Sequence, residues 1–200
     1  MTEINTLRDI LNLVPDGFRC EIIDNVLYVQ PGPGLCPPQH EQTIGALVAE
    51  LRPRYQKGTT GPGGWYIQTR PGVTLPAHLV GVKVPLGIEK DSFQPDVAGW
   101  RGHTVGSLSF TTANETAVCP DWVCEVLSTN RAYDWGTKKP AYEKLGVRYL
   151  WMVDPDERSL EAFERVNGAY RSIAKGTGSV VLQGVEPFPG WDVVLTDLWS

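Results

Sequence analysis

The sequence lacks a long apolar run, a closely spaced cysteine pair and an excess of basic residues. No apolar stretch approaches the roughly 20 residues that a membrane-spanning helix needs, and the first ten residues carry acids where a signal peptide is apolar. We therefore expect a cytoplasmic protein with no membrane partner. The cysteines show no CxxC spacing and are predicted to be reduced, mostly packed thiols, at Cys20, Cys36, Cys119 and Cys124.

Basic charge is scarce as well. The chain has 18 Lys and Arg against 23 Asp and Glu, a net charge of −5, which argues against a basic coat for nucleic acid but leaves room for a local basic cleft. Hydrophobic residues make up 42% of the chain, enough for a core, so a disordered chain is excluded. We expect one domain over residues 1–200, with an N-terminal helix and hairpin (1–30), a core (about 39–155) and a C-terminal hairpin and strands (156–200).

The N-terminal quarter combines turn signals with a change of period. Residues 1–17 predict a short helix that ends in a Pro-Asp-Gly turn, and the apolar runs 18–23 and 26–30 predict a β-hairpin. The proline-rich stretch 31–39 predicts a rigid loop. From His40 onward, apolar residues recur at helical spacing, so we expect an amphipathic helix that ends at Arg52, before Pro53.

The rest of the chain alternates predicted strands with one helix. Strands are expected at 65–70, 80–85, 93–100 and 121–127, followed by a polar connection and a helix over 138–145 with Thr137 as its N-cap and Gly146 at its end. A buried strand (147–153), a hairpin around Asn167-Gly168 and one or two strands in 179–200 complete the pattern. This order indicates an α/β fold, a mixed sheet with helices on both sides.

Two acidic residues lie at unusual positions in predicted strands, Asp96 at the start of one and Glu125 inside a buried one. In the apolar run 121–127, side chains alternate between faces, so Glu125 shares a face with Val123 and Leu127. An unpaired carboxylate there is costly; it either pairs with a cation that only fixes the packing or binds a metal or a proton. Asp96 follows a proline at the start of a strand, where a strand-end role and a catalytic role both remain open.

Lys138 lies in the first turn of the predicted helix, where the macrodipole disfavours a cation. It is either a solvated lysine or the neighbour of a negative group, and Tyr142, four residues later, can face the same side. Two carboxylates with one ammonium suggest a divalent-metal phosphodiesterase, because carboxylate oxygens suit Mg²⁺ and the metal supplies a hydroxide.

Three motifs carry a resemblance to a known family. PDVAGW (95–100), PDWVCEVLS (120–128) and DWGTKKPAYEKLGVRYLWMVDP (134–155) occur in the order found in the Uma-type putative restriction endonucleases, a domain-of-unknown-function family of the PD-(D/E)XK nuclease superfamily. The resemblance implies a restriction-endonuclease-like core, and it implies that Asp96 and Glu125 are metal-binding acids. The superfamily lysine position is Leu127 here, and Lys138 matches a lysine moved to the next helix, with Lys139 as the fallback.

Further site residues follow from the same resemblance. Superfamily members often bring an acid from the first core helix, which makes Glu41, with His40 beside it, a candidate; the simpler interpretation is that this pair only starts the helix. Relatives often carry an acid where this chain has Arg70. His78 and His103 lie in loops and lack a partner at ligand spacing, so no zinc site is expected.

These residues predict a Mg²⁺- or Mn²⁺-dependent endonuclease that acts on DNA. The alternatives are a catalytically weak or inactive nuclease-fold protein that binds nucleic acid or protein, and an acid–base enzyme for a small substrate. A homodimer is also expected, because seven tryptophans are many for this length and Trp65, Trp100 and Trp199 are not obviously all core.

Overall fold

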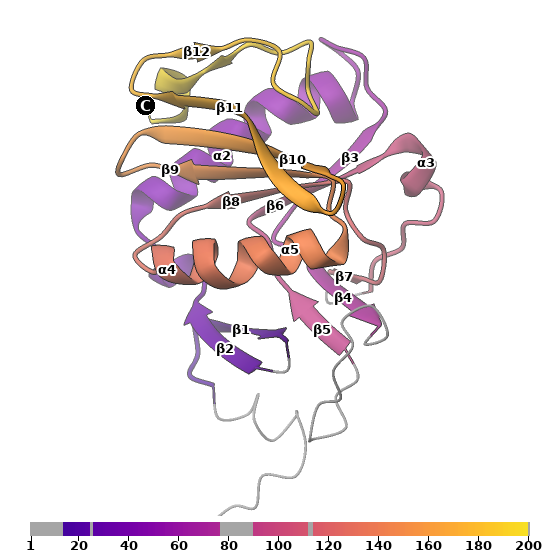
Figure 1. Cartoon of the computed structure of the whole chain (residues 1–200), viewed down its shortest axis with the longest axis vertical. Coiled ribbons are helices and arrows are strands. Elements are labelled where there is room, and N and C mark those ends of the chain that lie inside the picture. Colours follow the sequence, from indigo (N-terminus) through magenta and orange to yellow (C-terminus); the bar gives the residue numbers. More distant parts are fainter. Residues whose placement is uncertain (1–13, 25, 77–89, 112–113, 200) are drawn as a thin grey trace, which may run out of the picture.

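A computed structural model describes residues 14–24, 26–76, 90–111 and 114–199 of the chain. Its centre is a six-stranded sheet in the order β11-β10-β9-β8-β6-β3 (Figure 1). In that order the strands are Ala169–Thr177, Ser159–Val166, Tyr149–Asp154, Trp122–Val126, Val97–Arg101 and Trp65–Thr69. The β8–β9 pair is parallel and the other neighbouring pairs are antiparallel. The predicted mixed sheet is confirmed.

A smaller sheet packs beside the first. Its order is β2-β1-β5-β4-β7, with the strands Val26–Pro31, Phe18–Ile23, Lys90–Phe93, Gly72–Pro76 and Glu115–Thr116. The predicted N-terminal hairpin is therefore present as β1 and β2, and it belongs to this second sheet. Two short strands near the C-terminus, β12 (Val181–Leu182) and β13 (Val193–Val194), pair with each other, as the tail pattern predicted.

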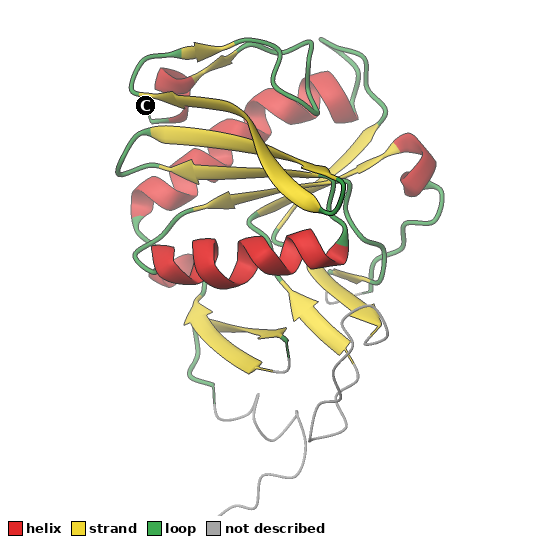
Figure 2. Ribbon diagram, viewed as in Figure 1, coloured by secondary structure: helices red, strands yellow, loops and turns green. Residues whose placement is uncertain are grey.

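Helices cover both faces of the larger sheet, as the ribbon in Figure 2 shows. α2 (Pro38–Leu51) lies on one face. On the other face, α4 (Arg131–Tyr133), the π turn η4 (Asp134–Lys138) and α5 (Lys139–Leu145) run as one continuous helical segment between β8 and β9. The remaining short elements are the 3₁₀ turns η1 (Pro33–Leu35) and η5 (Leu195–Leu198), the π turn η2 (Arg52–Gln56) and α3 (Gly102–Val105).

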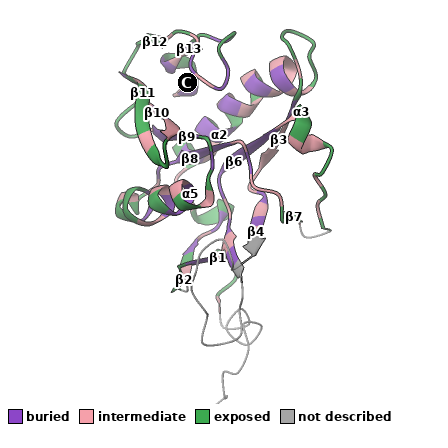
Figure 3. Ribbon diagram, turned by 45° about the vertical axis from the view of Figure 1, so that its right-hand side comes forward, coloured by how far each residue is buried: buried purple, intermediate pink, exposed green. Residues whose placement is uncertain are grey.

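The alternation predicted for β8 is confirmed by the packing on its two faces. Trp122 and Cys124 pack in the core beneath α2, whereas Val123 and Leu127 pack in the core beneath α5. The central strands are buried along their lengths (Figure 3). From α2, Leu47 is fully buried, and burial of such a side chain stabilises the fold by about 1.5–3 kcal/mol. Glu125 therefore lies on the α5 side of the sheet.

The helix that carries Lys138 begins earlier than predicted. The stretch expected to be a polar connection is helical from Arg131, so Thr137 is not an N-cap and Lys138 is not in a first turn. The macrodipole argument for Lys138 was therefore wrong. Pro140 lies directly after the π turn, in which the Lys139 N–H donates to the Asp134 carbonyl. A proline without an N–H fits after such a turn.

Pro53 has a similar local environment. The regular helix ends at Leu51, one residue before the predicted end, but the chain continues through Pro53 as a π turn, in which the Lys57 N–H donates to the Arg52 carbonyl at 2.9 Å. The proline does not stop the helical path, because the wide turn does not need its missing N–H. The stretch 31–39, predicted to be free of helix, likewise contains η1 and the first two residues of α2.

The strand predicted within 93–100 begins directly after its Pro95-Asp96 pair, as β6, whereas Phe93 ends a strand of the other sheet. β5 ends at Phe93 in the smaller sheet and β6 begins at Val97 in the larger one. Pro95, between them, cannot donate to a sheet ladder, so the chain changes sheets at residues 94–96. This change of sheet places Asp96 at the contact between the two sheets.

The remaining hairpin and strand predictions agree with the structure. Asn167 and Gly168 both have positive φ, +52° and +89°, as the tight turn between β10 and β11 requires. Gly146 ends α5 with φ +86°, a conformation that glycine adopts without strain. Residues 1–13 of the predicted first helix, the strand at 80–85 and His78 lie outside the described residues. Within the described part, no helix is both long and apolar enough to cross a membrane.

The tryptophans do not form the exposed cluster on which the homodimer prediction relied. Trp100 is fully buried and Trp65 is 9% exposed, so both belong to the core. Trp199 is half-buried, and its indole N–H donates to the Gly178 carbonyl at 3.2 Å. Self-association stays a prediction that these side chains do not support.

Candidate active site

Asp96 lies fully buried at the start of β6. Its Oδ2 accepts the backbone N–H of Val126 at 2.9 Å and lies 3.2 Å from Nε2 of His40. Its Oδ1 lies 3.6 Å from Nη1 of Arg19. That oxygen is buried and has no hydrogen-bond partner among the described residues. Asp96 therefore presents one well-held oxygen and one with capacity for a further positive partner.

The surroundings of Asp96 favour its charged form. Burial alone raises the pKa of a carboxyl, but the His40 hydrogen bond and the positive charge of Arg19 outweigh it and hold the pKa of Asp96 well below its usual range. In the same way, burial lowers the pKa of His40, while its hydrogen bonds and charge attraction to Asp96 and Glu41 raise it above the usual value overall. Each member of the pair therefore favours the charged form of the other.

Glu125 projects from β8 toward the helical segment. Its Oε1 lies 2.7 Å from Nζ of Lys138 and accepts a hydrogen bond from the Tyr142 hydroxyl. Burial, and then the negative charges of Asp96 and other nearby acids, raise the pKa of Glu125 to about 8, although Lys138 opposes the shift. Glu125, which the sequence singled out as the one acid in an apolar strand, is therefore buried and paired with Lys138. It also feels the negative charge of Asp96.

Lys138 is the most enclosed of these groups. Its side chain is completely buried, and its ammonium also lies 3.4 Å from Oε1 of Glu21 and donates to the Gln94 carbonyl at 3.4 Å. Burial lowers the pKa of an ammonium, but the charges of Glu125 and Glu21 more than compensate and raise the pKa of Lys138 above its usual value. The site thus holds a permanent cation between two acids.

Lys139, the fallback, faces elsewhere. Its ammonium lies 4.3 Å from the ring centroid of Phe163 and 5.5 Å from that of Trp135. The structure therefore brings Lys138, and not Lys139, to Glu125. Tyr142, one turn farther along, joins Lys138 at the same carboxylate, as the spacing predicted.

Two site residues of the N-terminal hairpin were not predicted. Glu21 accepts the Gln94 backbone N–H at 2.8 Å and the Tyr133 hydroxyl at 2.9 Å, and Arg19 reaches Asp96 from the same face of β1. A signal for Glu21 was present, because it is an acid in an apolar strand like Glu125. It was missed because the hairpin was treated as an addition to the core.

His40 and Glu41 start α2, as the simpler interpretation held, but they also reach the site. His40 is buried against Asp96, and its Nδ1 lies 3.3 Å from Oε1 of Glu41. Glu41 in turn pairs with Arg70, which stands where the family resemblance led us to expect an acid. Glu41 is therefore connected to Asp96 through His40. His103, on α3, lies 3.7 Å from Asp121 and takes no part.

The side chains at the margin of the site remain partly open to solvent. Asp96, Glu125 and Lys138 are at most 1% exposed, whereas the side chains of Arg19, Arg70 and Glu41 are 16%, 19% and 36% exposed. The solvent side of the site therefore carries the two guanidinium groups of Arg19 and Arg70.

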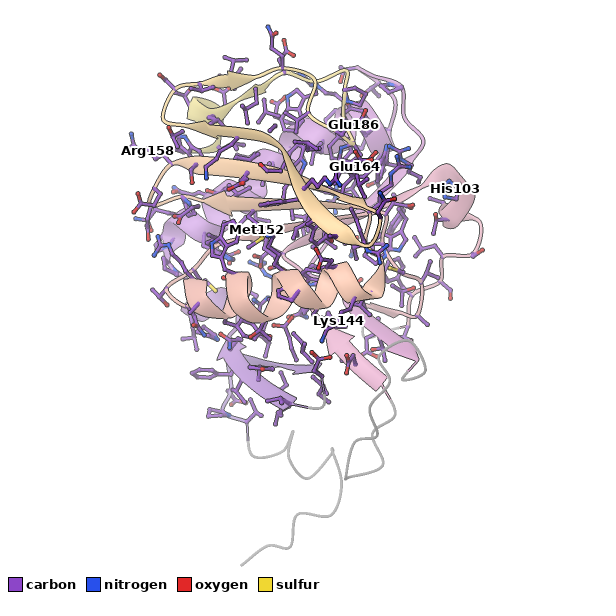
Figure 4. All side chains as sticks on the ribbon, viewed as in Figure 1. His103, Lys144, Met152, Arg158, Glu164 and Glu186 are labelled. Carbon is purple, nitrogen blue, oxygen red and sulfur yellow. The ribbon has the colours of Figure 1, made fainter. Side chains whose placement is uncertain are left out.

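Away from the site, an ion pair between Asp24 and Lys144 also connects the smaller sheet to the helical segment; Figure 4 labels Lys144 on α5.

Comparisons with known proteins give a family and a fold. A family model described as Uma2, putative restriction endonuclease, matches residues 6–196. A crystal structure of a putative nuclease belonging to DUF820, from Anabaena variabilis, aligns with a TM-score of 0.68 over 97% of this chain and 97% of that chain, at 16% sequence identity. At that identity the likeness establishes the fold alone. No curated protein matches the chain.

Proposed function

Because the chain belongs to the Uma2 putative restriction endonuclease family, as its three motifs predicted, we propose that it is a divalent-metal-dependent endonuclease that hydrolyses phosphodiester bonds in DNA. One observation carries the proposal. Asp96, just before β6, accepts the N–H of Val126, which follows Glu125 on β8, and Glu125 pairs with Lys138 of the helical segment, so three fully buried charged groups lie near one another. In phosphodiester hydrolysis, two carboxylates can hold a metal ion and an ammonium can stabilise charge on the phosphate. Packing of the core alone does not explain why these charged groups are buried together.

The residues fit a divalent cation. Asp96 Oδ1 is a buried carboxylate oxygen without a hydrogen-bond partner in the described part of the chain, and Glu125 adds a second carboxylate. Oxygen donors of this kind are those that Mg²⁺ and Mn²⁺ prefer. Asp96 and Glu125 would hold the ion, which when bound supplies positive charge and an activated water.

The chain's own residues have distinct tasks in this mechanism. The Val126 N–H and His40 fix the Asp96 carboxylate, and Tyr142 fixes that of Glu125. The pKa of Lys138 is raised by Glu125 and Glu21, so Lys138 keeps its charge and stabilises negative charge that develops on the phosphate. This ammonium is already in place, so no reorganisation is needed when the charge develops.

Arg19 and Arg70 face the solvent side, where DNA approaches. Guanidinium groups bind phosphate oxygens in a bidentate manner, and they supply local positive charge to a protein that is acidic in total. Because Asp96, Glu125 and Lys138 are buried, DNA reaches them only when the covering side chains of the hairpin or of α2 move aside.

A plasmid-nicking assay tests the proposed function. The purified chain is expected to nick supercoiled DNA with Mg²⁺ or Mn²⁺ and to lose this activity with a chelator. Glu125→Gln should remove cleavage, whereas the matched control Glu164→Gln, a glutamate in an exposed ion pair on β10, should retain it. Cleavage that survives in the folded Glu125→Gln protein would overturn the proposal.

The second candidate, an inactive nuclease-fold protein that binds nucleic acid or protein, is favoured by one observation. Glu125 is already paired with Lys138, and Glu41 is paired with Arg70. This candidate predicts DNA retention in a gel-shift assay without cleavage, and no rise in melting temperature with Mn²⁺. The endonuclease predicts both cleavage and a metal-dependent rise.

A further inference from the structure

Three potential metal ligands of different chemistry gather beside the proposed active site. The ligand atoms of Cys36, His40 and Glu41 all lie within 4.8 Å of one another. One thiol, one imidazole and one carboxylate form a donor set unlike the carboxylates of Asp96 and Glu125. Sulfur and imidazole donors suit Zn²⁺ and similar transition metals, whereas Mg²⁺ prefers oxygen.

His40 has the orientation that a metal-bound histidine usually shows. Its Nε2 lies 3.2 Å from Oδ2 of Asp96, and its Nδ1 faces Glu41 at 3.3 Å. Metal-bound histidines almost always donate their second ring N–H to a carboxylate or carbonyl. Here Asp96 is that carboxylate, which leaves Nδ1 to face the ion. The fully buried ring is already fixed by the packing of α2.

Cys36 and Glu41 supply the other two donors from the solvent side. Cys36 follows η1 and is half-buried, and its thiol makes one long contact, 3.8 Å, to the Pro31 carbonyl. Glu41 is half-buried and pairs with Arg70 through Oε1, the same oxygen that faces His40. A carboxylate has two oxygens, so Glu41 can bind an ion through the other and keep its arginine.

We propose that Cys36, His40 and Glu41 form a binding site for a zinc-class transition-metal ion, next to the proposed magnesium centre and distinct from it in donor chemistry. A tetrahedral Zn²⁺ places its ligand atoms about 3.3–3.8 Å apart. From their separations of at most 4.8 Å, the three ligand atoms would approach one another by up to about 1.5 Å, which the loop position of Cys36 permits. Three protein ligands leave the fourth position open to water or to a phosphate oxygen.

This site has a consequence for Asp96. The His40 ring would connect the transition metal to the carboxylate that orients it, so an ion at Cys36 and Glu41 adds positive charge one imidazole away from the proposed magnesium ligand. The assignment rests on the Cys36, His40 and Glu41 geometry and does not depend on DNA cleavage, so it can fail or hold independently of the endonuclease proposal.

Cobalt spectroscopy on the full metal-free chain tests the site. Co²⁺ should give a thiolate-to-cobalt charge-transfer band and the strong visible bands of tetrahedral coordination, and one equivalent of Zn²⁺ should remove both. Cys36→Ser should abolish the charge-transfer band and weaken Zn²⁺ binding at least about 10-fold, because even the loss of a supporting residue costs about 10–100-fold. The control Cys20→Ser, another half-buried cysteine, should change neither.

Two further variants separate this site from the proposed magnesium centre. Glu125→Gln should keep the cobalt spectrum while it loses Mn²⁺ binding. Asp96→Asn, which alters the partner of His40, should weaken Zn²⁺ about 10-fold and keep the thiolate band. Melting curves confirm that each variant is folded. A wild-type protein without a thiolate band, or an unchanged band in Cys36→Ser, would overturn the assignment.

Discussion

The ammonium of Lys138 lies 3.4 Å from Oε1 of Glu21, and both side chains are completely buried. The lysine belongs to the helical segment between β8 and β9, and the glutamate belongs to the N-terminal hairpin. This ion pair therefore ties the smaller sheet to the proposed active site, and the hairpin becomes part of the site.

Glu21→Gln is expected to lower the free energy of unfolding by about 1–3 kcal/mol, because it removes a charge that balances buried Lys138. It should also reduce DNA cleavage, since Lys138 loses one of its two anionic supports. Urea denaturation measures the first effect. Asp24→Asn, which removes a solvent-exposed ion pair with Lys144 on the same hairpin, should cost only about 0–1 kcal/mol. Equal losses in the two variants would contradict the structural role of Glu21.

Substitution of Lys138 and of its neighbour Lys139 should have very different effects on stability and on DNA cleavage. Lys138→Met is expected to cost about 3–5 kcal/mol, because it leaves Glu125 and Glu21 without their cation, and to lower cleavage about 100- to 1,000-fold. Lys139→Met removes contacts over Phe163 and Trp135, at about 0.5–2 kcal/mol. It should keep full cleavage. Denaturation and single-turnover cleavage measure both, and a loss of cleavage confined to Lys139→Met would reverse the assignment.

Mn²⁺ should stabilise the folded chain. At 100 times its dissociation constant, an ion that binds only the native state adds about 2.7 kcal/mol, which corresponds to a rise in melting temperature of about 5–10 °C at this chain length. Asp96→Asn should remove the rise, and Glu164→Gln should preserve it. Differential scanning calorimetry with and without the ion provides the measurement, and an undiminished rise in Asp96→Asn would exclude Asp96 as a ligand.

Asp154, at the end of β9, should make the free energy of unfolding depend on pH in the acidic range. Burial raises the pKa of its carboxyl, but Arg131 and the backbone N–H groups of Glu157 and Asp156 outweigh that effect and lower the pKa. Because the pKa of Asp154 is lower in the folded state, its charged carboxylate stabilises the fold. This stabilisation is complete above the pKa of the unfolded state, about 4, and is lost as the pH falls through the pKa of the folded state.

Asp154→Asn is therefore expected to cost about 1–3 kcal/mol at pH 7 and progressively less below about pH 4. Urea denaturation over this pH range measures the change. Asp156→Asn, in which the changed side chain is 61% exposed although it meets the same Arg131, should stay within about 1 kcal/mol of wild type. A constant difference between wild type and Asp154→Asn down to pH 3 would argue against the linkage.

The sequence predicted those features that depend on neighbouring residues. The alternation in β8 placed Glu125 on one face with Val123 and Leu127, and this face packs under α5. The Asn167-Gly168 turn and the end of α5 at Gly146 were also local signals. These features follow from backbone geometry and side-chain period, which need no knowledge of distant contacts.

The features that were missed depend on tertiary contacts. Weak helix formers such as Asp134 and Gly136 made 128–137 look like a connection, yet burial of Tyr133 and Lys138 stabilises helix there. The roles of Glu21 and Arg19 exist only because two sheets meet at Asp96. Lys138 was identified through family resemblance, because the dipole argument from the sequence did not apply to its true position in the helix.

Because the chain passes from one sheet to the other between β5 and β6, the site is complete only after both sheets have formed. Asp96 is in place only when both sheets have formed and docked, because its neighbours Arg19, His40 and Val126 come from three separate parts of the chain. A nascent or partly unfolded copy therefore has no complete centre. If the chain cuts DNA, that hazardous activity begins only after folding is finished, and it disappears as soon as the hairpin detaches.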